Sequence, residues 1–234
     1  MSSFLEEFAS IIAIGLIATY MSVESMLCYS YVWFVIEAVF IYSNALSSSL
    51  YKHVNNAIAT ESEDGCIKAG IYIRVCIIIN MIISIPLSVG VVYFIEEIMS
   101  FYGAGPGNDY DYDAVMEYTI IAVVHNFFST TSGFITITTD IDGYADFNAK
   151  YAFFDSIADI ALSAFVIPYY KPTLVQFGLI FFASEILSTA FYYYLTWYRW
   201  GWYDDYKDGM RSSVTMKNVS APQNRNYVFP HMKA

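Results

Sequence analysis

The chain has 234 residues, of which 57% are hydrophobic, 19% aromatic and only 14% charged, whereas soluble domains carry roughly a quarter of charged residues. The 22 acidic side chains outnumber the 11 basic ones and give a net charge of -11, which excludes a basic nucleic-acid groove and predicts no nucleic-acid partner. The composition therefore predicts an integral membrane protein, and the apolar runs are assigned as membrane spans.

The first apolar region, residues 4–50, is too long for a single crossing, because a membrane helix needs about 20 residues. We therefore predict two helices, over about 5–23 and 29–51. A tight turn near Glu24–Ser30 would join them. The second helix carries one acid, Glu37, among apolar neighbours.

The middle of the chain contains the two clearest spans. Residues 75–95 hold no charged side chain, and residues 118–139 hold only His125 and Tyr118 as ionisable groups. Both segments are as long as the hydrocarbon core of a bilayer requires. They predict two transmembrane helices joined by an acidic loop.

Two further spans are predicted near the carboxy-terminal end, over 149–170 and 173–198. The first of them contains Asp155 and Asp159, and the second contains Glu185. Apart from these acids both segments are mainly apolar. The predicted fold class is therefore all-α, an integral membrane bundle of about six transmembrane helices.

Lysine and arginine are distributed unevenly about this bundle, which would occupy residues 1–203. With six crossings, ten of these side chains fall on one face and Lys171 alone falls on the other. Because loops on the inner side of a membrane are enriched in Lys and Arg, both ends of the chain are predicted to lie inside. The ten are Lys52, Lys68, Arg74, Lys150, Arg199, Lys207, Arg211, Lys217, Arg225 and Lys233.

Ionisable side chains inside the predicted spans are candidates for function, because a charge at mid-bilayer costs at least about 2.5–3.5 kcal/mol. Asp155 and Asp159 are four residues apart and share a helical face, which suits a proton or cation relay or a contact with a neighbouring chain. Glu185 is in mid-span and is a candidate for proton or cation coupling, although a facing hydroxyl would also satisfy it. Glu37 and His125 are solitary candidates for lining a cavity.

Several segments resemble one transporter family. In Leu46–Ile77 a span ends in small residues, and a Val-Asn-Asn sequence at 54–56, a turn and a helix with Ala and Arg follow. A polar turn at Asp140–Asp146 precedes Asn148, which opens the next span, and the last helix ends in an aromatic and charged stretch at Tyr198–Arg211. This pattern resembles the carboxy-terminal lobe of the multidrug and toxic compound extrusion (MATE) family.

The resemblance covers about residues 30–205. Members of that family have two six-helix lobes that face each other across a central cavity, and they export organic cations against protons or sodium. This chain has helices for one such lobe. The resemblance therefore implies that a second lobe is supplied by another chain or a second copy, or that the chain has a role other than transport.

The end of the chain differs from the rest. From Gly209 onward it is polar and basic and contains no acid. We expect this tail, within residues 204–234, to dock on a neighbouring protein or on anionic lipid. The side chains that would do so are Arg211, Lys217, Arg225 and Lys233.

Two functions of different classes are compatible with this pattern. One is a structural or accessory subunit of a larger membrane complex, such as a respiratory assembly of the mitochondrial inner membrane, although other membranes fit equally well. The other is a half-size exporter of organic cations, coupled to protons or cations, that works with a second lobe. No catalytic or cofactor motif is present, so we expect no enzymatic activity, no metal and no cofactor, with membrane lipids as bound partners.

Overall fold

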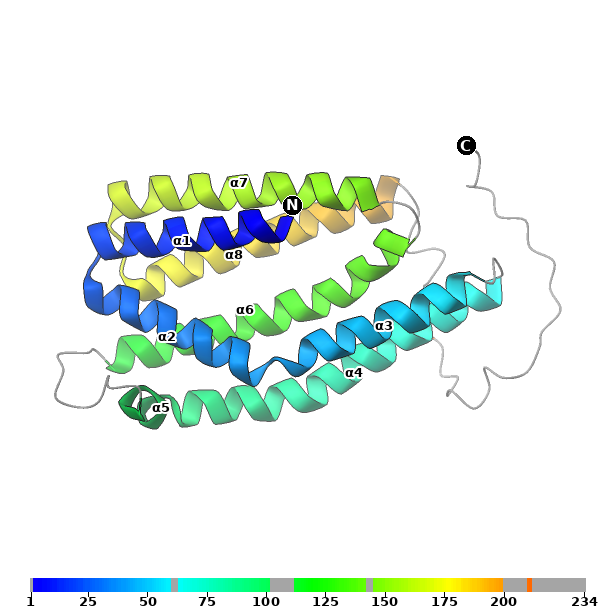
Figure 1. Ribbon diagram of the computed structural model, residues 1–234, viewed down its shortest axis with the longest axis horizontal. Helices are drawn as coiled ribbons and strands as arrows, with labels where there is room; N and C mark the ends of the chain where they lie inside the picture. Colours follow the sequence, from blue (N-terminus) through cyan, green and yellow to red (C-terminus); the bar gives the residue numbers. More distant parts are fainter. Residues whose placement is uncertain (1, 60–62, 102–111, 142–144, 200–209, 212–234) are drawn as a thin grey trace.

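The computed structural model describes residues 2–59, 63–101, 112–141, 145–199 and 210–211, and in this part of the chain the regular structure is helical. The all-α prediction is therefore confirmed for the described residues. Figure 1 shows the helices running along one long axis. They are α1 (Ser2–Tyr20), α2 (Val23–Val39), α3 (Tyr42–Ile58), α4 (Glu63–Tyr93), α5 (Ile95–Phe101), α6 (Tyr112–Thr139), α7 (Ala145–Tyr170) and α8 (Leu174–Tyr193), which continues into a π-helical segment, Tyr194–Arg199.

Length and hydropathy make the chain a candidate multi-pass membrane protein. The bent pair of α2 and α3 adds a fifth span if it is counted as one crossing, and α1 contributes a shorter apolar stretch, Ile11–Tyr20. The described residues thus support four or five spans where the sequence predicted about six. The four helices that qualify by themselves are Gly65–Tyr93, Tyr112–Thr139, Ala145–Tyr170 and Leu174–Thr196.

The predicted helix over 29–51 is wrong in one respect, because the chain bends by 49° between α2 and α3. The turn predicted near Glu24–Ser30 also lies earlier in the chain. Ser22 is the N-cap of α2, and its hydroxyl oxygen accepts a hydrogen bond from the backbone N–H of Ser25 at 3.0 Å. This cap satisfies a backbone donor that the helix itself leaves unpaired, and so α2 begins at Val23.

The bend is accompanied by a buried polar network. The hydroxyl of Tyr42, the first residue of α3, lies 3.1 Å from Asn80 Oδ1 and 2.5 Å from Ser84 Oγ on α4. Asn80 also reaches Thr131 on α6 through its amide nitrogen, at 3.4 Å. Because buried polar groups in an apolar medium must be hydrogen-bonded, these contacts favour the position of α3 against α4 over a straight continuation of α2.

A sharp reversal separates α7 from α8. Lys171 has a positive φ of 46°, and the following Pro172 disfavours helical backbone at the residue before it. Thr173 and Gln176 then form a capping box, each side chain bonding the other's backbone N–H, and start α8. As a result α7 and α8 run antiparallel next to each other.

The bundle has two sides with α6 between them. Figure 1 shows α1, α7 and α8 together on one side and α3 and α4 on the other, while α2 crosses from one group to the other. The helix α6 packs against α8, α4, α3 and α2, whereas α7 packs mainly against α1 and α8. Two buried apolar clusters hold α6 to the α2–α4 side. The opposite face of α6, toward α7 and α8, lines the candidate site.

Candidate functional site

Three neighbouring helices each carry a stripe of polar side chains at intervals of three or four residues. Such spacing places the members of a stripe on a single face of the helix. In helices that are apolar enough to cross a membrane, such stripes are expected on the faces that are turned away from lipid. They consist of His125, Ser129, Ser132 and Thr136 on α6, with Asp140 directly after it; Asn148, Tyr151, Asp155, Asp159 and Ser163 on α7; and Glu185, Ser188 and Tyr192 on α8.

The three stripes face one another across a cavity of about 550 Å³. Ala13 of α1 and Tyr29 and Trp33 of α2 complete its wall. His125 is the only basic residue among the described side chains that line this cavity. The acids that line it are Asp140, Asp155, Asp159 and Glu185. A cavity with this set of charges attracts cations and disfavours anions.

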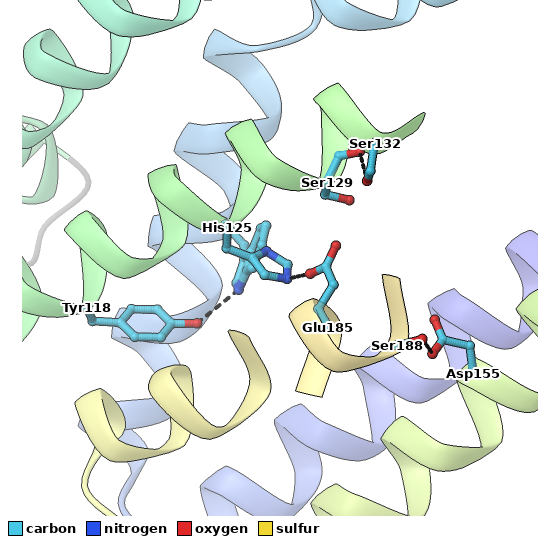
Figure 2. Close-up of polar contacts among 8 residues, drawn as sticks. Tyr118, His125, Ser129, Ser132, Asp155, Glu185 and Ser188 are labelled. Carbon is cyan, nitrogen blue, oxygen red and sulfur yellow. Dashed lines mark hydrogen bonds and ion pairs between the residues drawn. The ribbon is translucent and has the colours of Figure 1, made fainter. Parts of the chain in front are cut away.

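A histidine and a glutamate meet at the centre of the cavity. His125 Nε2 contacts Glu185 Oε2, which makes an ion pair when the imidazole is protonated (Figure 2). Ser129, one turn along α6, lines the same cavity as Glu185. Nδ1 of His125 is buried and has no hydrogen-bond partner among the described residues. Proton exchange between this pair and the cavity therefore has to pass on the Glu185 side.

A second carboxylate is held by α8. Ser188 Oγ donates to Asp155 Oδ1 (Figure 2), and the hydroxyl of Tyr151 donates to the backbone carbonyl of Ser188 at 2.5 Å. Lys150, the nearest base in sequence, is exposed and does not line the cavity. Asp155 is therefore partnered within the chain, across the α7–α8 interface.

A third cluster lies where α6 ends and α7 begins. The amide nitrogen of Asn148 donates to Asp140 Oδ1 at 2.6 Å and to Thr139 Oγ1 at 2.8 Å. Tyr192 of α8 donates to Asn148 Oδ1 at 2.8 Å, and its hydroxyl lies 2.6 Å from Thr139 Oγ1. These hydrogen bonds tie three helices together at this end of the cavity.

The structure brings together four of the five candidate coupling residues, namely His125, Asp155, Asp159 and Glu185. Glu37 does not join them, because it lies on an exposed face of α2. The sequence paired Asp155 with Asp159 on one helical face, but His125 and Glu185 were identified singly and the polar stripes to which all four belong were missed. A repeat of small polar residues every three or four positions on three consecutive spans was the available signal.

The predicted docking tail lies mostly outside the described residues, which include Arg211 but not Lys217, Arg225 or Lys233. Arg211 is exposed. The preceding residue, Met210, packs against the apolar cluster between α3, α4 and α6 of the same chain. The contacts of the tail with a partner stay a prediction.

Thiol labelling tests whether the cavity contains water. In a variant whose three native cysteines are replaced by alanine, Ser188→Cys should react with a charged, water-soluble maleimide in intact vesicles. Leu187→Cys is the matched control: Leu187 is 71% exposed on the outside of α8, where lipid keeps its thiol protonated and unreactive. Equal labelling of both positions, measured by mass spectrometry, would contradict an aqueous cavity bounded by a lipid-facing surface.

The described residues contain no group of three or more His, Cys, Asp or Glu side chains placed to hold a metal ion. The groups that line the cavity and could bind a ligand are carboxylates, one imidazole, hydroxyls and aromatic faces. Comparisons of the chain with protein-family models, with curated proteins and with solved structures find no match.

Proposed function

We propose that this candidate multi-pass membrane protein is a half-size carrier that binds an organic cation in the cavity and exchanges it for a proton. The observation that carries the proposal is the convergence of Glu185, His125, Asp155 and Asp159 on one cavity. Carboxylates inside a membrane are costly, and those that face an open cavity mark an ion or substrate path.

The size and lining of the cavity suit an organic cation. Its volume of about 550 Å³ lies within the range of roughly 300–1,000 Å³ for small-molecule sites. Tyr29, Trp33 and Phe181 line it next to His125 and Glu185. Aromatic faces attract cations, and carboxylates supply the opposite charge. A flat or methylated cation could therefore contact both kinds of group at once.

Proton coupling follows from the His125–Glu185 pair. While the pair holds one proton, on the imidazole or on the carboxyl group, it has no net charge. When that proton leaves for the water in the cavity, the carboxylate is left charged and a cation can take the place of the proton as its partner. One positive charge replaces another, so proton release and cation binding are linked.

The proposal includes the number of membrane crossings and the side of the membrane on which the chain ends lie. We infer six crossings with both ends inside, in which α1 and the bent pair α2–α3 each cross once. The alternating directions of successive helices support this assignment (Figure 1). A lobe similar to that of the MATE family would then be completed by a second copy or by another chain.

The other candidate, an accessory subunit of a larger membrane complex, stays a second proposal. Its support is the basic tail, in which Arg211 alone of the four basic docking residues is described. A cavity lined by four acids is not required by a purely structural role, and for this reason we favour the carrier.

Reconstitution tests the proposal. The full chain is placed in phosphatidylcholine and phosphatidylglycerol vesicles with an acidic interior, and ethidium is added outside. We expect ethidium to accumulate inside as protons leave, and an ionophore that collapses the pH gradient to stop the accumulation. Uptake equal to that of protein-free vesicles would overturn the carrier and leave the accessory subunit.

A further inference from the structure

Helices α6 and α8 run in the same direction and contact each other in a repeating register (Figure 1). Gly178 of α8 lies against Tyr118 of α6. Seven residues further along both helices, Glu185 meets His125. Because seven residues are close to two helical turns, the first contact lies almost directly above the second. The approach of the two helices at Gly178 therefore influences how the ionisable pair meets.

Gly178 permits this close approach because it has no side chain. A Cβ atom at this position would lie 2.8 Å from Cε2 of Tyr118. The Tyr118 side chain is only 3% exposed, so it has little room to move aside. At Gly90 and Gly133, by contrast, an added Cβ would meet no atom within 4 Å.

Trp33 connects Tyr118 with the histidine. Its indole Nε1–H donates a hydrogen bond to the Tyr118 hydroxyl at 3.0 Å. Its ring packs edge to face on the His125 imidazole, with ring centres 5.4 Å apart and an interplanar angle of 86°. Phe182 contacts the imidazole in a similar way, at 5.9 Å and 78°. The two aromatic rings restrict rotation of the imidazole while Nε2 contacts Glu185 (Figure 2).

We propose that Trp33 is a positioning residue for the His125–Glu185 pair: fixed by Tyr118, its indole holds the imidazole toward Glu185. The same indole lines the cation cavity, so one side chain contacts both the ligand space and the pair that carries the proton. The importance of this arrangement for coupling rests on the proposed function, whereas the positioning itself can be measured without transport.

The fluorescence of Trp33 reports on its contact with His125, because a protonated imidazole quenches an adjacent indole. The chain has four tryptophans, and replacing Trp197, Trp200 and Trp202 by Phe leaves Trp33 as the single emitter. In this background, with the full chain in phosphatidylcholine nanodiscs, emission should fall as the pH is lowered. Further replacement of His125→Gln should abolish the fall; an unchanged fall would overturn the contact.

The other ionisable groups that face the same space have to be considered in this titration. They are the carboxyl groups of Asp140 just after α6, Asp155 and Asp159 on α7 and Glu185 on α8, together with the phenol groups of Tyr29 on α2, Tyr151 on α7 and Tyr192 on α8. At low pH the carboxylates become carboxylic acids, which also quench an indole that they contact. A pH response that survives in the His125→Gln variant would therefore come from these groups and would count against the proposal.

Tyr118→Phe tests the positioning with a minimal change, since it keeps the ring and removes the acceptor of the Trp33 hydrogen bond. The loss of one net hydrogen bond lowers the ratio of molecules in which the indole contacts the imidazole to those in which it does not by about fivefold. We therefore expect a clearly smaller pH-dependent quench while the fold, followed by circular dichroism, is retained. If the Tyr118→Phe variant showed the same pH-dependent quench as the protein with Trp33 as its single tryptophan, the proposal would be overturned.

Gly178→Ala tests the same positioning by crowding the Tyr118 ring, and Gly133→Ala is its matched control. The methyl group at position 178 should displace Tyr118 and reduce the quench, whereas the methyl group at position 133 should leave it unchanged. If Gly178→Ala fails to fold, Tyr118→Phe decides alone.

Ethidium uptake separates the two proposals. Reduced quenching in the variants together with no uptake by the unmodified protein overturns the carrier and supports the positioning role. If uptake occurs, we expect Tyr118→Phe to change its pH dependence more than its apparent affinity for ethidium. Uptake with the same pH dependence as the unmodified chain would overturn the importance of the positioning for coupling and leave the carrier intact.

Discussion

Glu185→Gln is expected to remove the response of ethidium uptake to a pH gradient. Glutamine keeps the shape of the side chain, but it neither carries a negative charge nor takes part in proton exchange with His125. Ethidium binding should also weaken by roughly 10- to 100-fold, because interactions with a charged group contribute about 1.5–3 kcal/mol. Uptake into vesicles gives the first quantity, and fluorescence titration of ethidium with the purified protein gives the second.

Glu37→Gln is the matched control for this experiment. It makes the same chemical change in another apolar helix, at an exposed position that does not line the cavity. We expect its uptake and ethidium affinity to equal those of the unmodified chain. A Glu185→Gln protein that keeps gradient-driven uptake would show that the proton is exchanged elsewhere in the molecule.

Phe134→Ala is expected to destabilise the bundle by about 3 kcal/mol, a value at the lower end of large-to-small core substitutions. Phe134 of α6 is fully buried and packs with Leu50 and Val54 of α3 and Ile73 of α4. In a membrane the loss comes mainly from van der Waals contacts, since lipid is as apolar as the protein interior. Unfolding by increasing sodium dodecyl sulfate in mixed micelles, followed by circular dichroism, measures the change.

The matched control is Phe154→Ala on α7. Phe154 is 67% exposed on the outside of the bundle, so lipid or detergent replaces the contacts of the deleted ring. We expect its unfolding midpoint to lie close to that of the unmodified chain. Equal destabilisation by both substitutions would mean that position 134 is no better packed than the outer surface.

The later candidate spans could be predicted from the sequence because each combines sufficient length with few charges. The predicted segments 75–95, 118–139, 149–170 and 173–198 correspond largely to α4, α6, α7 and α8, although α4 ends at Tyr93. The amino-terminal region was predicted less well. Hydropathy does not reveal the bend between α2 and α3. The bend accompanies hydrogen bonds from Tyr42 to residues about 40 positions later in the chain, which a local hydropathy pattern does not contain.

In the candidate site, too, some features could be predicted from the sequence and others could not. His125 and Glu185 were identified singly, because an ionisable group within an apolar helix is conspicuous in any sequence. Their contact joins positions that are 60 residues apart in the chain. Trp33 and Tyr118 were not identified, since aromatic residues are common in such helices and their hydrogen bond exists only between packed neighbours.

The sequence by itself determined the helical class of this protein, its candidate membrane spans and the polar side chains inside them, because these depend on composition and on short spacings along one helix. Only the tertiary structure decided that α6, α7 and α8 turn their polar stripes toward a common cavity and that Glu37 faces away from it. The physical reason is that the rotation of each helix about its axis is set by packing against its neighbours, which no single segment encodes.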